Sequence, residues 1–83
     1  MKTFSIQLAS IADVKRFVTA ASQQPFDIDI VSGRYIIDAK SIMGIFSLDL
    51  TKPVELKYYE SVDEKPEQFE KFKESISKFI VNE

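Results

Sequence analysis

The chain has 83 residues, which is the length of one small domain, so we expect a single domain over residues 1–83. Hydrophobic residues make up 45% of the sequence and charged residues 29%, with two glycines and three prolines, a composition that excludes disordered and fibrous classes. The net charge of −2 argues against nucleic acid and anionic membrane surfaces as partners, because both attract basic proteins.

The sequence contains no histidine and no cysteine. This excludes serine–histidine and cysteine–histidine catalytic pairs, imidazole or thiolate metal sites, and phosphate carried on histidine. We therefore expect no enzyme activity, no metal site and no cofactor. No segment has the roughly 18 consecutive apolar residues of a membrane span, and the N-terminal residues contain no apolar stretch of the length found in signal peptides. We therefore expect a cytoplasmic protein without membrane insertion.

The first segment predicts a strand followed by a helix. Apolar and polar residues alternate over residues 3–8, the period of two that a strand with one buried face requires. Ser10 and Asp13 then form the Ser-x-x-Asp pattern that caps a helix start. The apolar residues that follow recur at helical spacing: Ile11, Val14, Phe17, Val18 and Ala21. We therefore expect an amphipathic helix that begins after Ser10.

The middle of the chain predicts a hairpin, a short helix and a further strand. Alternating residues 26–30 and 34–38 flank a Ser32-Gly33 turn, which is typical of a β-hairpin. Ser41 precedes a short apolar segment interrupted by Gly44, which favours a short helix capped by Ser41. Alternation resumes over residues 54–58 and predicts a fourth strand.

The last segment predicts a long closing helix. Acidic residues gather from residue 60 onward, and Pro66 fits the first helical position. The apolar residues of this segment are spaced as one helical stripe: Phe69, Phe72, Ile76, Phe79 and Ile80. The acidic residues between Glu60 and Glu74 fit the solvated outer face of such a helix.

The order of elements is strand, helix, strand, strand, short helix, strand, helix. Short connections favour antiparallel pairing, and apolar helix stripes need a sheet face to cover. We therefore expect an α+β fold in which three helices cover one side of a four-stranded antiparallel sheet, leaving the other face open.

Residues 40–48, Lys-Ser-Ile-Met-Gly-Ile-Phe-Ser-Leu, closely resemble the regulatory serine segment of HPr, the phosphocarrier of the bacterial sugar phosphotransferase system. The element order, the hairpin and the closing helix extend this resemblance over nearly the whole chain. The resemblance implies the open-faced β-sandwich of the HPr family.

The sequence departs from the family at the start of the first helix. HPr proteins carry the phosphoryl group on a histidine within a Gly-x-His-Ala-Arg-Pro run, and this chain has Ala-Ser-Ile-Ala-Asp over residues 9–13. Ser10 lies near the histidine position and Ala12 near that of the arginine, while Asp13 would repel phosphate. We therefore expect a protein that is not competent as a histidine phosphocarrier. Sugar transport through another acceptor, such as Ser10, is disfavoured because a serine phosphate ester lacks the transfer potential of a phosphoramidate.

Ser41 is the candidate site of regulatory phosphorylation. The resemblance implies recognition by HPr kinase/phosphorylase, and a phosphate at a helix start would face unpaired backbone N–H groups. The alternative is that Ser41 only caps the helix, a contribution of about 1 kcal/mol.

The residues after Ser41 are candidates for a partner surface. A helix of about two turns cannot bury every apolar residue it carries, so some of them are expected at the surface. The resemblance implies that Ile42, Met43 and Phe46, with Lys15 and Arg16, bind protein partners: phosphotransferase components, HPr kinase/phosphorylase or a transcriptional regulator. The alternatives are that the apolar residues only seal the core, or that the chain is a structural protein-interaction domain without a phosphotransferase role. We expect a monomer.

Overall fold

The computed structural model describes residues 2–59 and 66–82, which form an α+β fold. The described strands are β1 (Lys2–Ile6), β2 (Ile28–Ser32), β3 (Tyr35–Asp38), β4 (Val54–Tyr58) and β5 (Ile80–Asn82). They form one antiparallel sheet in the order β3-β2-β4-β1-β5. The helices are α1 (Ile11–Ser22), α2 (Ile42–Phe46) and α3 (Pro66–Ser75), and a 3₁₀ turn, Ser77–Phe79, leads into β5.

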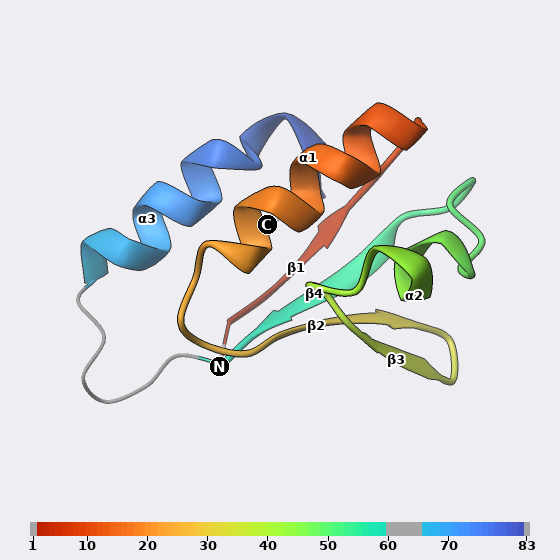
Figure 1. Ribbon diagram of the computed structural model, residues 1–83, viewed down its shortest axis with the longest axis horizontal. Helices are drawn as coiled ribbons and strands as arrows, with labels where there is room; N and C mark the ends of the chain where they lie inside the picture. The colour runs from red at the N-terminus through yellow and green to blue at the C-terminus, as the bar shows by residue number, and fades with distance from the viewer. Residues whose placement is uncertain (1, 60–65, 83) are drawn as a thin grey trace.

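The helices cover one face of the sheet (Figure 1). Along each central strand, alternate side chains are buried beneath α1 and α3, as the period of two requires. The buried set comprises Phe4, Ile6, Ile28, Ile30, Val54, Leu56 and Tyr58. The side chains between them, such as exposed Glu55 and half-buried Lys57, point to the opposite face, over which no helix of the described segments lies. The prediction of an open sheet face is confirmed.

An aromatic cluster joins β4 to α3. Tyr58 is fully buried and its ring centroid lies 4.6 Å from that of Phe69 and 5.8 Å from that of Phe72. On its other side Tyr58 meets Phe26 at 4.3 Å, in the segment that leads into β2. Tilted and edge-on pairs at these distances are favourable, so this cluster fixes α3 over the sheet.

The hairpin turn depends on one glycine. Ser32 pairs with Tyr35, which leaves Gly33 and Arg34 as a two-residue loop. Gly33 has φ +60°, and Arg34 has a negative φ. This is the combination of a type II′ turn, whose twist matches that of the flanking strands. The predicted hairpin is confirmed, with β3 beginning at Tyr35 and not at Arg34.

The prediction of four strands and a closing helix that extends to Ile80 was wrong. The α-helix ends at Ser75, Phe79 lies in the 3₁₀ turn, and Ile80 begins a fifth strand that pairs with β1. The backbone N–H of Gln7 donates to the carbonyl of Phe79 at 2.8 Å, so the edge of β1 takes its hydrogen bonds from this segment. Phe79 nevertheless remains buried in the same core as the apolar residues of α3. For that reason an apolar residue stands where the next turn of the helix would place one.

Candidate functional site

The start of α1 is closed by two reciprocal hydrogen bonds. Ser10 is the N-cap residue, and its hydroxyl accepts from the backbone N–H of Asp13 at 3.1 Å. The Asp13 carboxylate in turn accepts from the backbone N–H of Ala9 at 3.1 Å. A carboxylate therefore occupies the helix start at which the resemblance to HPr places the phosphate-carrying histidine, and the predicted cap is confirmed.

The start of α2 is capped by Ser41, as the sequence predicted. The exposed Ser41 hydroxyl accepts from the backbone N–H of Gly44 at 3.2 Å, and the Ser41 carbonyl accepts from Ile45 at 3.1 Å. The first turn of α2 holds no acidic residue. Asp38 precedes the cap, and its carboxylate accepts from the backbone N–H of Lys40 at 2.9 Å. Ser41 is thus accessible to solvent on a helix start without a carboxylate of its own.

Gly44 allows α2 to pack against β3. A Cβ atom at this position would lie 2.6 Å from Cγ2 of Ile37 and 3.0 Å from the Ser41 hydroxyl oxygen. No real Cβ atom tolerates the first distance, so only glycine fits between strand and helix without movement. The glycine that interrupts the apolar segment in the sequence is therefore required by packing.

The side chains of α2 divide between core and solvent. Ile45 is completely buried and Ile42 is half-buried, whereas Met43 is 76% exposed and Phe46 is 39% exposed. The expectation that some of these residues lie at the surface is confirmed. A flexible exposed methionine is suited to adaptable contact with a partner.

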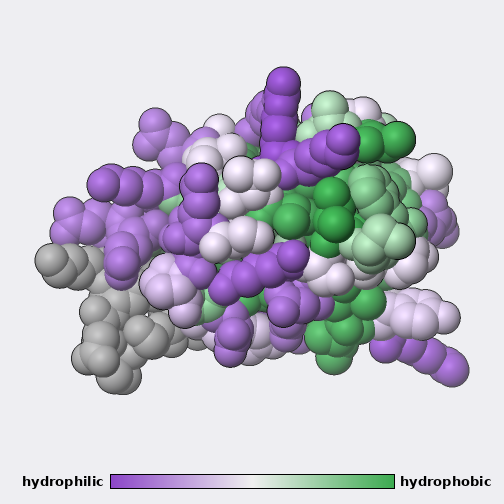
Figure 2. Space-filling model, in the orientation of Figure 1, coloured by the Kyte–Doolittle hydropathy of each residue, from purple (hydrophilic) through white to green (hydrophobic). Residues whose placement is uncertain are grey.

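α1 adds exposed residues beside α2. The two helices are in contact, and Lys15 and Arg16 of α1 are exposed, as is Ile11, which is 65% exposed. Figure 2 shows hydrophobic residues gathered where α1 and α2 lie, at the right of the view, and hydrophilic residues over α3. The sequence had assigned Ile11 to the buried stripe of α1, but the first helical residue turns outward. We call Ile11, Lys15, Arg16, Ile42, Met43 and Phe46 together the α1–α2 surface.

A polar hollow lies at the end of the β2–β3 hairpin opposite its turn. Asp27, Asp29, Asp38 and Tyr59 line a hollow of about 270 Å³. Loss of solvent raises the pKa of the Tyr59 phenol above its ordinary value, and the charge of Asp29 and its hydrogen bond to the phenol raise that pKa further. Within residues 2–59 and 66–82, no group of histidine, cysteine, aspartate and glutamate side chains is arranged to hold a metal ion.

Two further findings concern the described helices and the acidic segment before α3. None of the helices in the described segments is both long and apolar enough to span a membrane. The acidic residues at positions 60–65, interpreted from the sequence as part of a solvated helix face, lie outside the described residues.

Comparison with known proteins identifies the fold. The structure superposes on the crystal structure of HPr-C-His from Thermoanaerobacter tengcongensis with a TM-score of 0.70, at 27% identity, covering 94% of this chain and 89% of that one. The chain has the HPr fold. No protein-family model matches the sequence, and no curated protein matches it. The resemblance read from residues 40–48 is therefore supported at the level of the HPr fold, which suggests a protein of the phosphocarrier type.

Proposed function

We propose that this chain is an HPr-like regulatory or docking module of the phosphotransferase system that does not carry phosphate on histidine. The observation that carries the proposal is an HPr fold built from a sequence without histidine. The capping geometry of α1 supports it, because the Asp13 carboxylate stands beside Ser10 and disfavours an incoming phosphate.

In this proposal Ser41 is the regulatory residue. Its hydroxyl is exposed, and the backbone N–H of Gly44 that it now caps can be satisfied equally well by a phosphate oxygen. Phosphorylation would place nearly two negative charges next to Ile42 and Met43. The phosphate would then place an anionic group beside the apolar side chains of the α1–α2 surface and offset the charges of Lys15 and Arg16, without refolding of α2.

The α1–α2 surface is the proposed binding site for protein partners. It combines exposed Met43 and Phe46 with the exposed cations of α1, a combination suited to an apolar partner surface with acidic residues at its rim. The partners in the proposal are phosphotransferase components, HPr kinase/phosphorylase or a transcriptional regulator. The protein would bind them as a monomer, in the cytoplasm and without catalytic activity of its own.

The proposal has one competitor from another class of function. A structural interaction domain without a phosphotransferase role would use the same exposed surface, and Ser41 would then serve only as a helix cap. Transport through Ser10 is opposed by the Asp13 carboxylate at that helix start.

The decisive experiment is two phosphorylation reactions followed by intact-mass measurement. The purified chain is incubated with enzyme I and phosphoenolpyruvate, and separately with HPr kinase and ATP. We expect one added phosphate from the kinase alone, lost in Ser41→Ala and retained in Ser10→Ala. Phosphate transferred from enzyme I would overturn the proposal, and no phosphate from either reaction would favour the structural interaction domain.

A binding experiment tests the docking surface. Met43→Asp introduces a charge at the most exposed apolar side chain of α2 and should abolish binding to HPr kinase in a calorimetric titration. Ile36→Asp is the matched control, because Ile36 is 66% exposed on β3, outside the α1–α2 surface. Circular dichroism verifies the fold of both variants. Equal affinity of the wild type and Met43→Asp would remove the α1–α2 surface from the proposal.

A further inference from the structure

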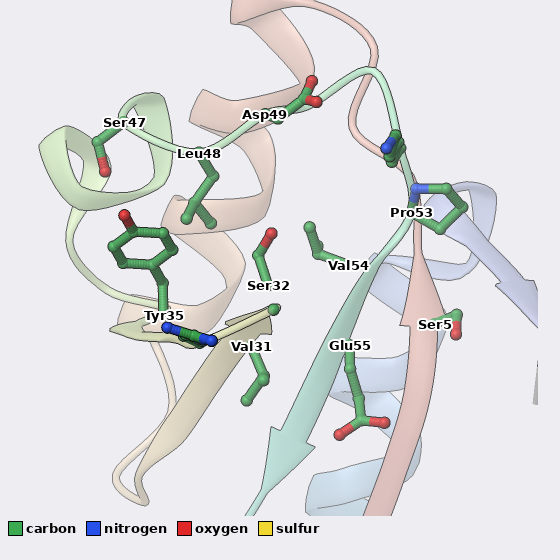
Figure 3. Close-up of a pocket in the computed structure, with 13 residues that line it drawn as sticks. Ser5, Val31, Ser32, Tyr35, Ser47, Leu48, Asp49, Pro53, Val54 and Glu55 are labelled. Carbon is green, nitrogen blue, oxygen red and sulfur yellow. The ribbon is translucent and has the colours of Figure 1, made fainter.

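A second concave site lies at the end of the sheet where the hairpin turns. It is an open groove of about 940 Å³ between the β2–β3 turn and residues 47–53, which lead from α2 into β4 (Figure 3). This volume falls in the range of sites that hold small molecules. The resemblance to HPr assigns no role to the groove, and the α1–α2 surface does not include it.

The acidic side chains of the groove have hydrogen-bonding or ionic partners, and within the described residues its basic side chains do not. Arg34 and Lys52 line it, as do Asp49 and Glu55. The Asp49 carboxylate accepts from the backbone N–H of Thr51 at 3.0 Å and from its hydroxyl at 2.5 Å. Glu55 has an ammonium partner, Lys57, at 3.9 Å.

The two cations have no such partners. Within residues 2–59 and 66–82, neither Arg34 nor Lys52 makes a salt bridge or a side-chain hydrogen bond. Lys52 acts on Asp49 only through its charge, which lowers the pKa of that carboxyl. The groove therefore offers a guanidinium and an ammonium, while its two carboxylates are already held by neighbouring groups.

The remaining lining combines apolar side chains with the hydroxyl groups of Ser5, Ser32 and Ser47. Figure 3 shows Tyr35 beside Leu48, with Val54 on the opposite side. Tyr35 is 68% exposed, so most of its ring is available for contact, and Leu48 is half-buried. An aromatic ring and aliphatic side chains next to unpaired cations suit a ligand with an apolar body and an anionic group.

Both rims of the groove are held in place by local structure. The left-handed Gly33 fixes the turn that carries Arg34, and the Asp49 side chain fixes residues 49–51 through its two hydrogen bonds to Thr51. A rim that is already ordered loses little conformational entropy when a ligand binds.

We propose that this groove binds a small organic anion, with the anionic group bound by Arg34, the apolar body against the neighbouring Tyr35 and Leu48, and Lys52 supplying a second positive charge to the groove. The guanidinium presents paired donors that match a phosphate or carboxylate, and Lys52 adds a second positive charge. The proposal is independent of the proposed function, because none of its four residues belongs to the α1–α2 surface.

The test uses 1-naphthyl phosphate as the probe and the intact ¹⁵N-labelled chain. Titration should produce saturable amide shifts at Ser32, Arg34 and Leu48 and none at Met43. Two comparison ligands separate the contributions, 1-naphthol for the apolar body and inorganic phosphate for the anion. Both should bind several-fold more weakly than the probe, since each makes only part of the contacts.

Charge-removing variants complete the test. Arg34→Gln should raise the dissociation constant of the probe by roughly fivefold or more, as expected for the loss of one charge-assisted contact, and Lys52→Gln should raise it by a smaller factor. Lys71→Gln, which removes the same charge from an exposed position on α3, should leave it unchanged. Shifts centred on α2, equal affinity for 1-naphthol or for inorganic phosphate, no saturable binding, or insensitivity to both groove variants would overturn the proposal.

Discussion

The two helix starts use the same cap and differ in charge. At α1 the Ser10 hydroxyl accepts from the third helical residue, Asp13, at 3.1 Å, and at α2 the Ser41 hydroxyl accepts from the third residue, Gly44, at 3.2 Å. The side chain of Asp13 returns to the backbone of Ala9, whereas Gly44 has no side chain and lies against β3.

This difference shows how one residue changes the charge at a helix start. The partial positive charge of α1 is already neutralised by the Asp13 carboxylate. The first turn of α2 has no carboxylate, and its capping serine is exposed. The same fold therefore has one helix start that carries a carboxylate and one that does not.

The largest effect is expected from Gly44→Ala. The new Cβ would collide with Ile37, so we expect a loss of about 1–3 kcal/mol in the free energy of unfolding, measured by urea denaturation. Asp13→Ala changes the equivalent position of α1 and should cost only about 0.5–1 kcal/mol, through the lost cap and charge. If Gly44→Ala stabilised the protein, as this change does in an unobstructed helix, the close approach to β3 would be refuted.

Ser10→Ala should have the next largest effect. It leaves the N–H of Asp13 without its acceptor and is expected to cost about 1 kcal/mol of unfolding free energy. Ser22→Ala at the exposed last residue of α1 is the control and should change stability by less than about 0.5 kcal/mol. Equal losses in the two variants would mean that the cap does not stabilise α1.

A charge placed at each cap tests the comparison directly. Ser41→Asp should be close to neutral, because aspartate also caps helices and α2 lacks a competing carboxylate. Ser10→Asp should be less stable than Ser41→Asp by about 0.5 kcal/mol, because two carboxylates would share the start of α1. This difference should shrink in about 1 M salt, which screens exposed charges. A difference that is independent of salt would exclude repulsion by Asp13 as its cause.

The smallest effect concerns a carboxylate cap outside the helices. The hydroxyl and backbone N–H of Thr51 hold the pKa of Asp49 below its ordinary value of 3.8. The stabilisation is therefore complete above pH 3.8 and is lost as the pH falls through the lowered pKa. An NMR titration of the Asp49 carboxyl should show this, and Thr51→Val should move the pKa upward. An unchanged pKa in Thr51→Val would assign the shift to the backbone N–H of residue 51 and to the charge of Lys52, and not to the hydroxyl.

Local capping explains why both helix starts could be predicted from the sequence. Ser10, Asp13 and Ser41 act on backbone groups within four residues of themselves, so their roles follow from spacing alone. The requirement for Gly44 could not be predicted, because the atom that excludes a side chain belongs to Ile37 on a different element.

The end of α3 and the groove escaped prediction for the same physical reason. Phe79 and Ile80 continue a helical spacing, and only hydrogen bonding to β1, far away in the sequence, turns them into a 3₁₀ turn and a strand. The groove is lined by Arg34 and Lys52 from two connections that share no motif. Interactions within one element follow from the sequence pattern, whereas interactions between distant elements form only in the folded chain.

The sheet order also has a consequence for how the chain acquires its structure. β1 is made first during synthesis, yet it lies between β4 and β5, both from the second half of the chain. Loop closure over such separations costs chain entropy and slows folding. Until β4 and β5 pair with it, both edges of the first strand lack their backbone partners, and its apolar face, with Phe4 and Ile6, is the surface that a holding chaperone would recognise.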